Sequence, residues 1–144
     1  MIVKATLEDL DWMMEDMLLM YEEMAPFGAL HEEKCRNFFS NSIEHHFVMK
    51  DEEQRAHMGL RFESHWYTTD LALYEYYIYV KPEFRKTRLA FELYKTAKAI
   101  ASHLKLPFFY GTFRKPESDF ARVNKFLKRQ GGVQVGANYF WKGE

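Results

Sequence analysis

Residues 79–90 read Tyr79-Val80-Lys81-Pro82-Glu83-Phe84-Arg85-Lys86-Thr87-Arg88-Leu89-Ala90 and carry the strongest structural signal in the chain. Pro82 cannot donate to a sheet ladder, so it predicts the end of the aromatic strand that precedes it. A basic turn follows, and a segment with the apolar spacing of a helix comes next. The first amides of that helix have no partners within the helix and lie at the positive end of its dipole. This order of elements favours the binding of an anion such as a pyrophosphate.

Three strands are predicted upstream of this turn, over Ile43–Lys50, Ala56–Glu63 and Leu71–Val80. Apolar Met58, Leu60 and Phe62 alternate with polar His57 and Arg61, which is the period of a strand with one buried face. A charged turn over 51–54 predicts that the first two of these strands form a hairpin. The third is almost wholly aromatic and aliphatic, so we expect a long central strand.

The remaining elements complete an α/β pattern. We predict strands over Ile2–Ala5, Pro107–Gly111 and Val133–Trp141, and helices from Thr6 to about Met24, over Glu32–Asn41, from Thr87 to Leu104 and from Glu117 to Gln130. Three consecutive strands lie directly before the helix that begins near Thr87, and strands alternate with helices after it. The order predicts a mixed central sheet of about six strands flanked by about four helices, antiparallel early and parallel around that helix.

Length and composition predict one globular domain over residues 1–144. The chain is 47% hydrophobic and 17% aromatic, and its one cysteine, Cys35, excludes an intrachain disulfide. The first residues are quickly acidic and do not resemble a signal peptide, and no apolar run approaches the ~20 residues that cross a bilayer. We therefore expect a cytoplasmic protein that does not enter the membrane.

The charge is divided between the two parts of the chain. Residues 1–80 carry 6 Lys and Arg against 16 Asp and Glu, a net charge of −10, whereas residues 81–144 carry 14 against 5, a net charge of +9. The two parts either attract one another within the fold or produce a surface with a basic side that suits phosphate-bearing ligands. Binding of nucleic acid by the basic part ranks last, because cofactor phosphates also explain these residues.

The turn and its surroundings resemble the coenzyme-A-binding segment of the GNAT acetyltransferase superfamily. The pattern usual in that family is Arg/Gln-x-x-Gly-x-Gly/Ala, and the window Arg85-Lys86-Thr87-Arg88-Leu89-Ala90 matches it at Arg85 and Ala90, with Arg88 in place of the middle glycine. The resemblance extends to Lys4–Asp9 at the start and to residues 126–132, 135–136 and 139–140 near the end. In detail it is similar to short GNAT-like proteins of tailed phages and prophages.

The resemblance implies an acyl-CoA-dependent N-acyltransferase that moves acetyl from acetyl-CoA directly to a primary amine in a ternary complex. It implies that the edge of Tyr77–Val80, with Tyr79 and Val80, holds the pantetheine arm. A free amide near Tyr79 would polarise the thioester carbonyl where this strand separates from 108–111. It further implies pyrophosphate contacts from Arg85, Lys86, Thr87, Arg88, Leu89 and Ala90, and a cofactor contact from Asn124 on the last helix.

The acid and base are predicted from single positions. Glu75 is the best candidate base, because it is the one acidic residue in an aromatic strand and burial raises the pKa of a carboxyl; Glu63 is the second choice. In the family the acid is commonly a tyrosine four residues before the glycine of the last helix, and here that position is Leu127. Tyr110 and Tyr139 are the candidates to replace it.

One alternative to catalysis remains open besides nucleic-acid binding, which ranks last. The absence of the family's glycine and tyrosine leaves open a GNAT-fold protein that acts as an interaction module without turnover. Dimers through the last strands are frequent in the family, so a homodimer is a further expectation. We predict no metal site, because His31 and Cys35 lack a second ligand pair and adjacent His45 and His46 point to opposite faces of a strand.

Overall fold

The computed structural model describes residues 1–23, 28–111 and 120–135, with Phe120 as backbone alone. Its strands are β1 (Ile2–Lys4), β2 (Phe47–Asp51), β3 (Ala56–Ser64), β4 (Leu71–Val80) and β5 (Phe108–Phe109). Its α-helices are α1 (Leu10–Glu23), α2 (Glu32–His45), α3 (Leu89–Leu104) and α4 (Phe120–Arg129), and its 3-10 turns are η1 (Leu7–Asp9) and η2 (Pro82–Phe84). None of the described helices is both long and apolar enough to cross a membrane.

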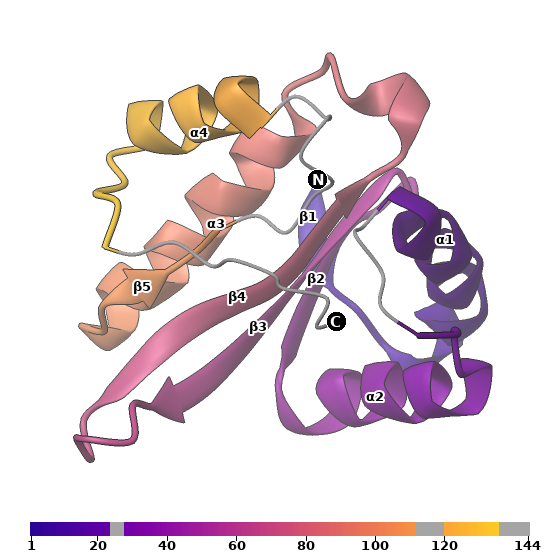
Figure 1. The fold of residues 1–144 in the computed structure, drawn as a ribbon, viewed down its shortest axis with the longest axis horizontal. Helices are drawn as coiled ribbons and strands as arrows, with labels where there is room; N and C mark the ends of the chain where they lie inside the picture. Colours follow the sequence, from indigo (N-terminus) through magenta and orange to yellow (C-terminus); the bar gives the residue numbers. More distant parts are fainter. Residues whose placement is uncertain (24–27, 112–119, 136–144) are drawn as a thin grey trace, which may run out of the picture.

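The sheet has the strand order β1-β2-β3-β4-β5. Its first four strands pair antiparallel and β5 pairs parallel to β4, which confirms the predicted mixed sheet. In Figure 1, α1 and α2 cover one face of this sheet and α3 and α4 cover the other. The described residues make five strands where about six were predicted, because the sixth lies largely in 136–144, outside the described residues, and 133–135 are not in a strand.

The boundary between α2 and β2 corrects one prediction. Ile43 was assigned to a strand, but α2 continues to His45 and β2 begins at Phe47. The reason is helical spacing: Ile43 lies four residues after Phe39, and both side chains are buried in the same core. The backbone changes direction at His46, which leaves the helical conformation.

The start of the chain follows its sequence signal. The Thr6 amide donates to Oδ2 of Asp9 over 2.9 Å, as the predicted capping box requires. Burial alone would raise the pKa of Asp9, but hydrogen bonds from Lys50, Thr6 and Trp12 hold it below its ordinary value. The buried carboxylate thus ties the start of α1 to β2.

Two hydrophobic cores fix β4 between the helix layers. On one face, Leu60, Leu73 and Leu93 are fully buried with α3; on the other, Met13 and Phe39 are buried against the sheet from α1 and α2. Each such side chain contributes ~1.5–3 kcal/mol on burial. The central strand is therefore held rigidly, and groups along its free edge have defined positions.

Candidate functional site

A β-bulge interrupts β4 at its centre. Gly59 of β3 lies opposite Tyr77 while Leu60 lies opposite Glu75, so Tyr76 is an extra residue on β4. The rings of Tyr76 and Tyr77 both close over Gly59, where a Cβ would lie 2.4 Å from Tyr76 Cζ and 2.3 Å from Tyr77 Cε1. The absence of a side chain at Gly59 is what allows both rings onto one face of the sheet.

Beyond the bulge, one edge of β4 is open within the part of the chain that the structure describes. β5 pairs only with Leu73 and Tyr74, and the described residues supply no strand partner for β4 further along on that side. The Lys81 amide donates to the Arg55 carbonyl next to β3, whereas the Val80 carbonyl faces away from β3. Because backbone groups alternate in direction along a strand, the amides of Ile78 and Val80 face the open edge. Ile78 and Val80, on either side of Tyr79, are therefore the residues whose amides match the free amide expected near Tyr79.

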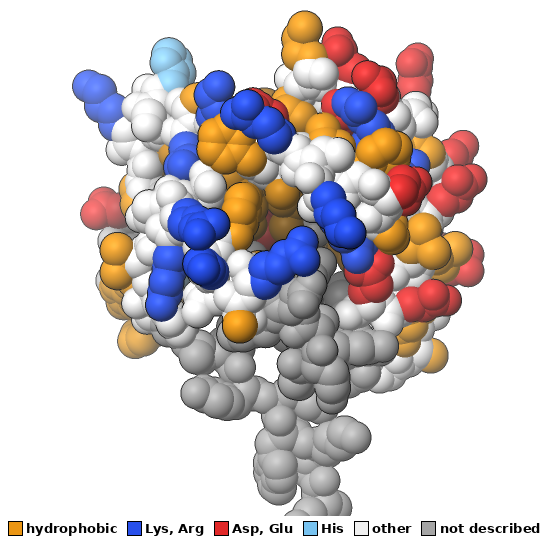
Figure 2. Space-filling model, turned by 90° about the horizontal axis from the view of Figure 1, so that it is seen from above, with side chains coloured by type: hydrophobic (Ala, Val, Ile, Leu, Met, Phe, Trp, Pro, Cys, Tyr) orange, Lys and Arg blue, Asp and Glu red, His pale blue; other side chains and the backbone are white. Residues whose placement is uncertain are grey.

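A cavity of about 800 Å³ surrounds this open edge. Its walls come from both faces of the sheet: Met17, Met20, Phe38 and Phe39 of α1 and α2 on one side, and Ala90, Phe91, Tyr94 and Phe126 of α3 and α4 on the other. Residues 75–80 of β4 run between the two walls. Figure 2 shows a face of the molecule where Lys and Arg side chains gather around a hollow with hydrophobic side chains inside it.

Glu75 lies on the cavity wall and is held from two sides. The Tyr94 hydroxyl donates to its Oε2 over 2.8 Å, and the Gly111 amide donates to the same oxygen over 3.3 Å. Burial raises the pKa of Glu75 to about 7, although both hydrogen bonds oppose that shift. Burial and the neighbouring carboxyl also raise the pKa of Tyr94 well above its ordinary value. Glu75 thus gains and loses its proton near neutral pH, while Tyr94, its hydrogen-bond partner, stays protonated.

The start of α3 presents unpaired backbone donors to the same cavity. The Leu89 amide donates to the Thr87 hydroxyl over 3.4 Å, and the Glu92 amide donates to the Arg88 carbonyl over 2.9 Å. Between them, the Ala90 and Phe91 amides have no acceptor among the described residues, and both residues line the cavity. The turn therefore presents backbone amides without acceptors among the described residues, and anion binding there stays a prediction.

Arg88 does not cover these donors. Its backbone has φ −84°, a conformation open to any residue, so the glycine usual in the family is not required by this turn. The side chain is 80% exposed, lies over the Phe91 ring and comes within 3.6 Å of Glu92. Its charge stays near the turn without closing it, and Lys86 beside it is exposed as well.

Arg85 has internal partners. Its Nη2 lies 2.6 Å from Oε1 of Glu23, its Nε donates to the Val80 carbonyl over 2.8 Å, and its guanidinium lies over the Tyr79 ring. Arg85 therefore lines the cavity while joining the turn to the end of α1, with its charge balanced by a carboxylate. Burial raises the pKa of the Tyr79 hydroxyl to about 12.

Other predicted site residues lie elsewhere. Tyr110 packs against Tyr94 and Phe108 and is not part of the described cavity wall. Glu63 pairs with Arg61 on the exposed end of β3, and Tyr139 lies outside the described residues.

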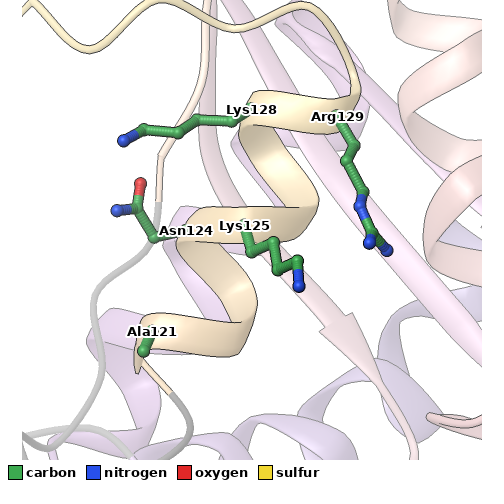
Figure 3. A pocket seen from close by; sticks show the side chains of 5 residues that line it. All are labelled: Ala121, Asn124, Lys125, Lys128 and Arg129. Atoms are coloured by element: carbon green, nitrogen blue, oxygen red, sulfur yellow. The ribbon is translucent and has the colours of Figure 1, made fainter.

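Asn124 lies on α4 but does not line the main cavity. It lines an open depression on the helix surface together with Ala121, Lys125, Lys128 and Arg129. Figure 3 shows Asn124 and Lys128 pointing to one side of α4 and Lys125 and Arg129 to the other. The cavity-facing side of α4 is formed by Arg122, Val123, Phe126 and Leu127 instead.

Sequence reasoning missed Tyr94. It lies one helical turn after Ala90, the last residue of the window that resembles the coenzyme-A-binding segment. Residues four apart on a helix share a face, so this spacing indicates that Tyr94 continues the cavity wall that Ala90 begins. That spacing was the signal available in the sequence.

A buried polar group lies behind the tyrosines on the α1 and α2 side. The Tyr77 hydroxyl is 3.1 Å from Nδ1 of His57, and Nε2 of His57 is 3.5 Å from Oδ2 of Asp16. Burial lowers the pKa of His57, which is therefore neutral at pH 7. Lys81 lies 3.7 Å from the other oxygen of Asp16, so this group ties the end of β4 to α1.

Several solved structures of acetyltransferases are similar to the chain. No protein-family model and no curated protein sequence matches it. Aminoglycoside 6'-N-acetyltransferase AAC(6')-Ih from Acinetobacter baumannii is similar with a TM-score of 0.70 at 14% identity, over 100% of this chain and 97% of that one. A probable acetyltransferase is similar with a TM-score of 0.71 at 23% identity, over 100% and 98% of the two chains.

A third neighbour is a predicted acetyltransferase with acetyl-CoA from Clostridium acetobutylicum. Its TM-score is 0.69 at 12% identity, over 99% of this chain and 95% of that one. At such identities the likeness concerns the backbone, and it covers the whole length of the chain. Together with the bulged central strand, its open edge and the parallel β5, it establishes that the chain has the fold of the GNAT acetyltransferases.

Proposed function

We propose that this protein is an acyl-CoA-dependent N-acyltransferase that moves acetyl from acetyl-CoA to a primary amine in a ternary complex. The observation that carries the proposal is the Glu75 carboxyl, with a pKa of about 7, on the wall of a cavity at the open edge of β4. A base poised near neutral pH suits removal of a proton from an amine. The open edge supplies backbone groups for the donor.

The donor fits the α3 side of the cavity. The Ala90 and Phe91 amides are positioned for the pyrophosphate, with Lys86 and Arg88 adding positive charge. The pantetheine arm then runs along β4, where Ile78 and Val80 offer backbone hydrogen bonds. An amide at this edge also stabilises the negative charge that develops on the thioester oxygen. The Clostridium acetobutylicum neighbour with acetyl-CoA supports this choice of donor.

The acceptor nitrogen attacks the thioester carbonyl from the opposite side of β4. Its ammonium form first loses a proton to solvent through the Glu75 carboxylate. As the new C–N bond forms, Glu75 takes the second proton from nitrogen, and the C–S bond breaks to release the CoA thiolate. The products are the N-acetyl amide and free CoA.

Tyr94 completes the proton transfer. Its hydroxyl gives a proton to the departing sulfur and recovers one from Glu75 through their 2.8 Å hydrogen bond. The proton lost by nitrogen is thereby returned to sulfur, and both side chains end in their starting states. In this proposal Tyr94, on α3, takes the role of the tyrosine that the family commonly carries at the position of Leu127. Tyr110 and Tyr139 are the other candidates for this role.

Ligand binding to one turn tests the proposal. Ala90→Pro removes an unpaired amide at the second position of α3 and breaks no helical hydrogen bond. Millimolar CoA should raise the melting temperature of the wild type, and this shift should be lost or strongly reduced in the variant. Glu33→Pro makes the same change at the second position of α2, away from the cavity, and should keep the shift. No shift in the wild type would contradict the proposal.

An interaction module without turnover is the second candidate. It is favoured by an exposed apolar group where β3 joins β4, in which Trp66 is 95%, Tyr67 is 67% and Leu71 is 52% exposed. Steady release of CoA with any amine would exclude this candidate, whereas absence of turnover across a broad amine panel would favour it.

A further inference from the structure

We infer that the acceptor is a monoamine carried on a single apolar group, aryl or alkyl, that binds between α2 and the bulge of β4. The inference rests on the proposed function and specifies its second substrate. It concerns the part of the cavity on the α1 and α2 face, where Phe38, Tyr76 and Met20 form the wall.

The wall on this side is aromatic and unusually open. Phe38 is 47% exposed although it lines the cavity, and its ring meets the Tyr76 ring edge-on at 5.3 Å. Met17 and Met20 add flexible apolar surface from α1. An apolar group of variable shape can pack against the exposed Phe38 ring and the flexible methionines. The same surface offers few hydrogen bonds to a hydroxylated group.

The carboxylates that line the cavity can balance the charge of one ammonium group. Among the described residues that line the cavity, the acidic ones are Glu23 and Glu75. Glu23 is paired with Arg85 at 2.6 Å, which leaves Glu75 to face the reacting nitrogen. A second ammonium in this cavity would meet Lys34, and among the described residues no spare carboxylate lines the cavity to balance it. Like charges in a partly enclosed site disfavour a polyamine.

The outer surface on this side is acidic and attracts cations. The exposed residues Glu22, Glu32 and Glu33 lie at the ends of α1 and α2 that border the cavity residues of these helices. A cationic amine is drawn toward this acidic side, while its apolar part suits the aromatic wall within. The apolar wall and the lack of a spare carboxylate among the described lining residues, rather than this outer surface, distinguish such an amine from aminoglycosides, which are polycationic and rich in hydroxyl groups.

Steady-state kinetics with an amine panel test the inference. At saturating acetyl-CoA, kcat/KM should be at least tenfold higher for 2-phenylethylamine than for spermidine or kanamycin. It should also rise from butylamine to hexylamine by roughly fourfold per methylene, the expected gain from burying one such group. Mass spectrometry identifies each N-acetyl product, and free thiol measures the rate.

Phe38→Ala locates the binding surface. It should lower kcat/KM for 2-phenylethylamine about tenfold while leaving the KM for acetyl-CoA unchanged. Phe62→Ala is the matched control, because Phe62 is 39% exposed on β3 and does not line the cavity. If Phe38→Ala instead lowers the rate with hexanoyl-CoA and spares the amine, the aromatic wall holds the acyl chain and the inference is overturned.

The remaining outcomes separate the inference from the function on which it rests. Faster turnover of kanamycin or spermidine than of 2-phenylethylamine overturns the inference and supports the acyltransferase. Binding of acetyl-CoA without turnover of any apolar amine also overturns it. Failure of the wild type to bind CoA overturns both.

Discussion

Tyr94 and Glu75 share a 2.8 Å hydrogen bond between α3 and β4, although the residues lie 19 positions apart. Each alters the other, since the phenol opposes the rise in the pKa of the carboxyl and the carboxyl raises the pKa of the phenol. Under the proposed function, removal of either partner should therefore affect both the rate and its pH dependence, which distinguishes a role in proton transfer from one in packing.

Glu75→Gln should lower kcat by about 10²- to 10⁴-fold, the usual contribution of a general base. For the wild type, kcat/KM should rise with pH up to about 7 and then level, because the base acts as the carboxylate. The variant should lose that inflection and retain CoA binding in a thermal-shift assay. Glu63→Gln, on the exposed end of β3, serves as the control and as the test of the second-choice base. Equal loss in both variants would contradict the assignment to Glu75.

Tyr94→Phe should lower kcat by roughly 10- to 100-fold and move the pH inflection upward, because the Tyr94 hydrogen bond lowers the pKa of Glu75. A pH profile of the variant measures both effects. Tyr110→Phe removes the other described candidate hydroxyl. An unchanged inflection in Tyr94→Phe, together with slow turnover in Tyr110→Phe, would assign the acid to Tyr110.

Stability should depend on the same carboxyl. The folded pKa of Glu75, about 7, lies above its ordinary value of 4.5, so the folded state holds the proton more tightly. The tighter binding of this proton contributes its full share to the free energy of unfolding below about pH 4.5. That share is lost as the pH rises through about 7. Relative to the wild type, Glu75→Gln should gain stability on the order of 3 kcal/mol between pH 4 and pH 8. Urea unfolding of both proteins at each pH checks this, and parallel pH dependences would contradict it.

Gly59→Ala should destabilise the fold by roughly 1–3 kcal/mol, because its methyl group would overlap the rings of Tyr76 and Tyr77. Gly111→Ala is the matched control, since a Cβ there meets nothing within 4 Å. Urea denaturation compares the two variants. Equal stability would indicate that the tyrosine rings do not close over the bulge.

Local signals made much of the fold predictable. Apart from Glu75, the residues of β4 are aromatic or aliphatic, and Pro82 follows shortly after the strand, so the strand was predicted with its observed limits. The strand assigned to Ile43 was wrong because a β-branched residue also fits a helix face when Phe39 lies one turn earlier. Local composition does not distinguish these two possibilities.

The candidate site was predictable in part. The anion-binding turn and Glu75 stand out within single stretches of sequence. The bond between Glu75 and Tyr94 depends on how α3 packs on the sheet, and the bulge at Tyr76 depends on the register between two strands. Neither relationship is visible in a local pattern. Likewise, the carboxylate that pairs with Arg85 belongs to Glu23, 62 positions away.

The cavity has walls on both faces of the sheet, with the edge of β4 between them. In the proposed function the two substrates therefore enter by separate routes, and neither route passes through the space of the other. An inert amine analogue should then inhibit noncompetitively against acetyl-CoA, since its occupancy leaves the donor's route clear. The proposed function therefore predicts that the products depart in either order, in a kinetic scheme of random sequential type.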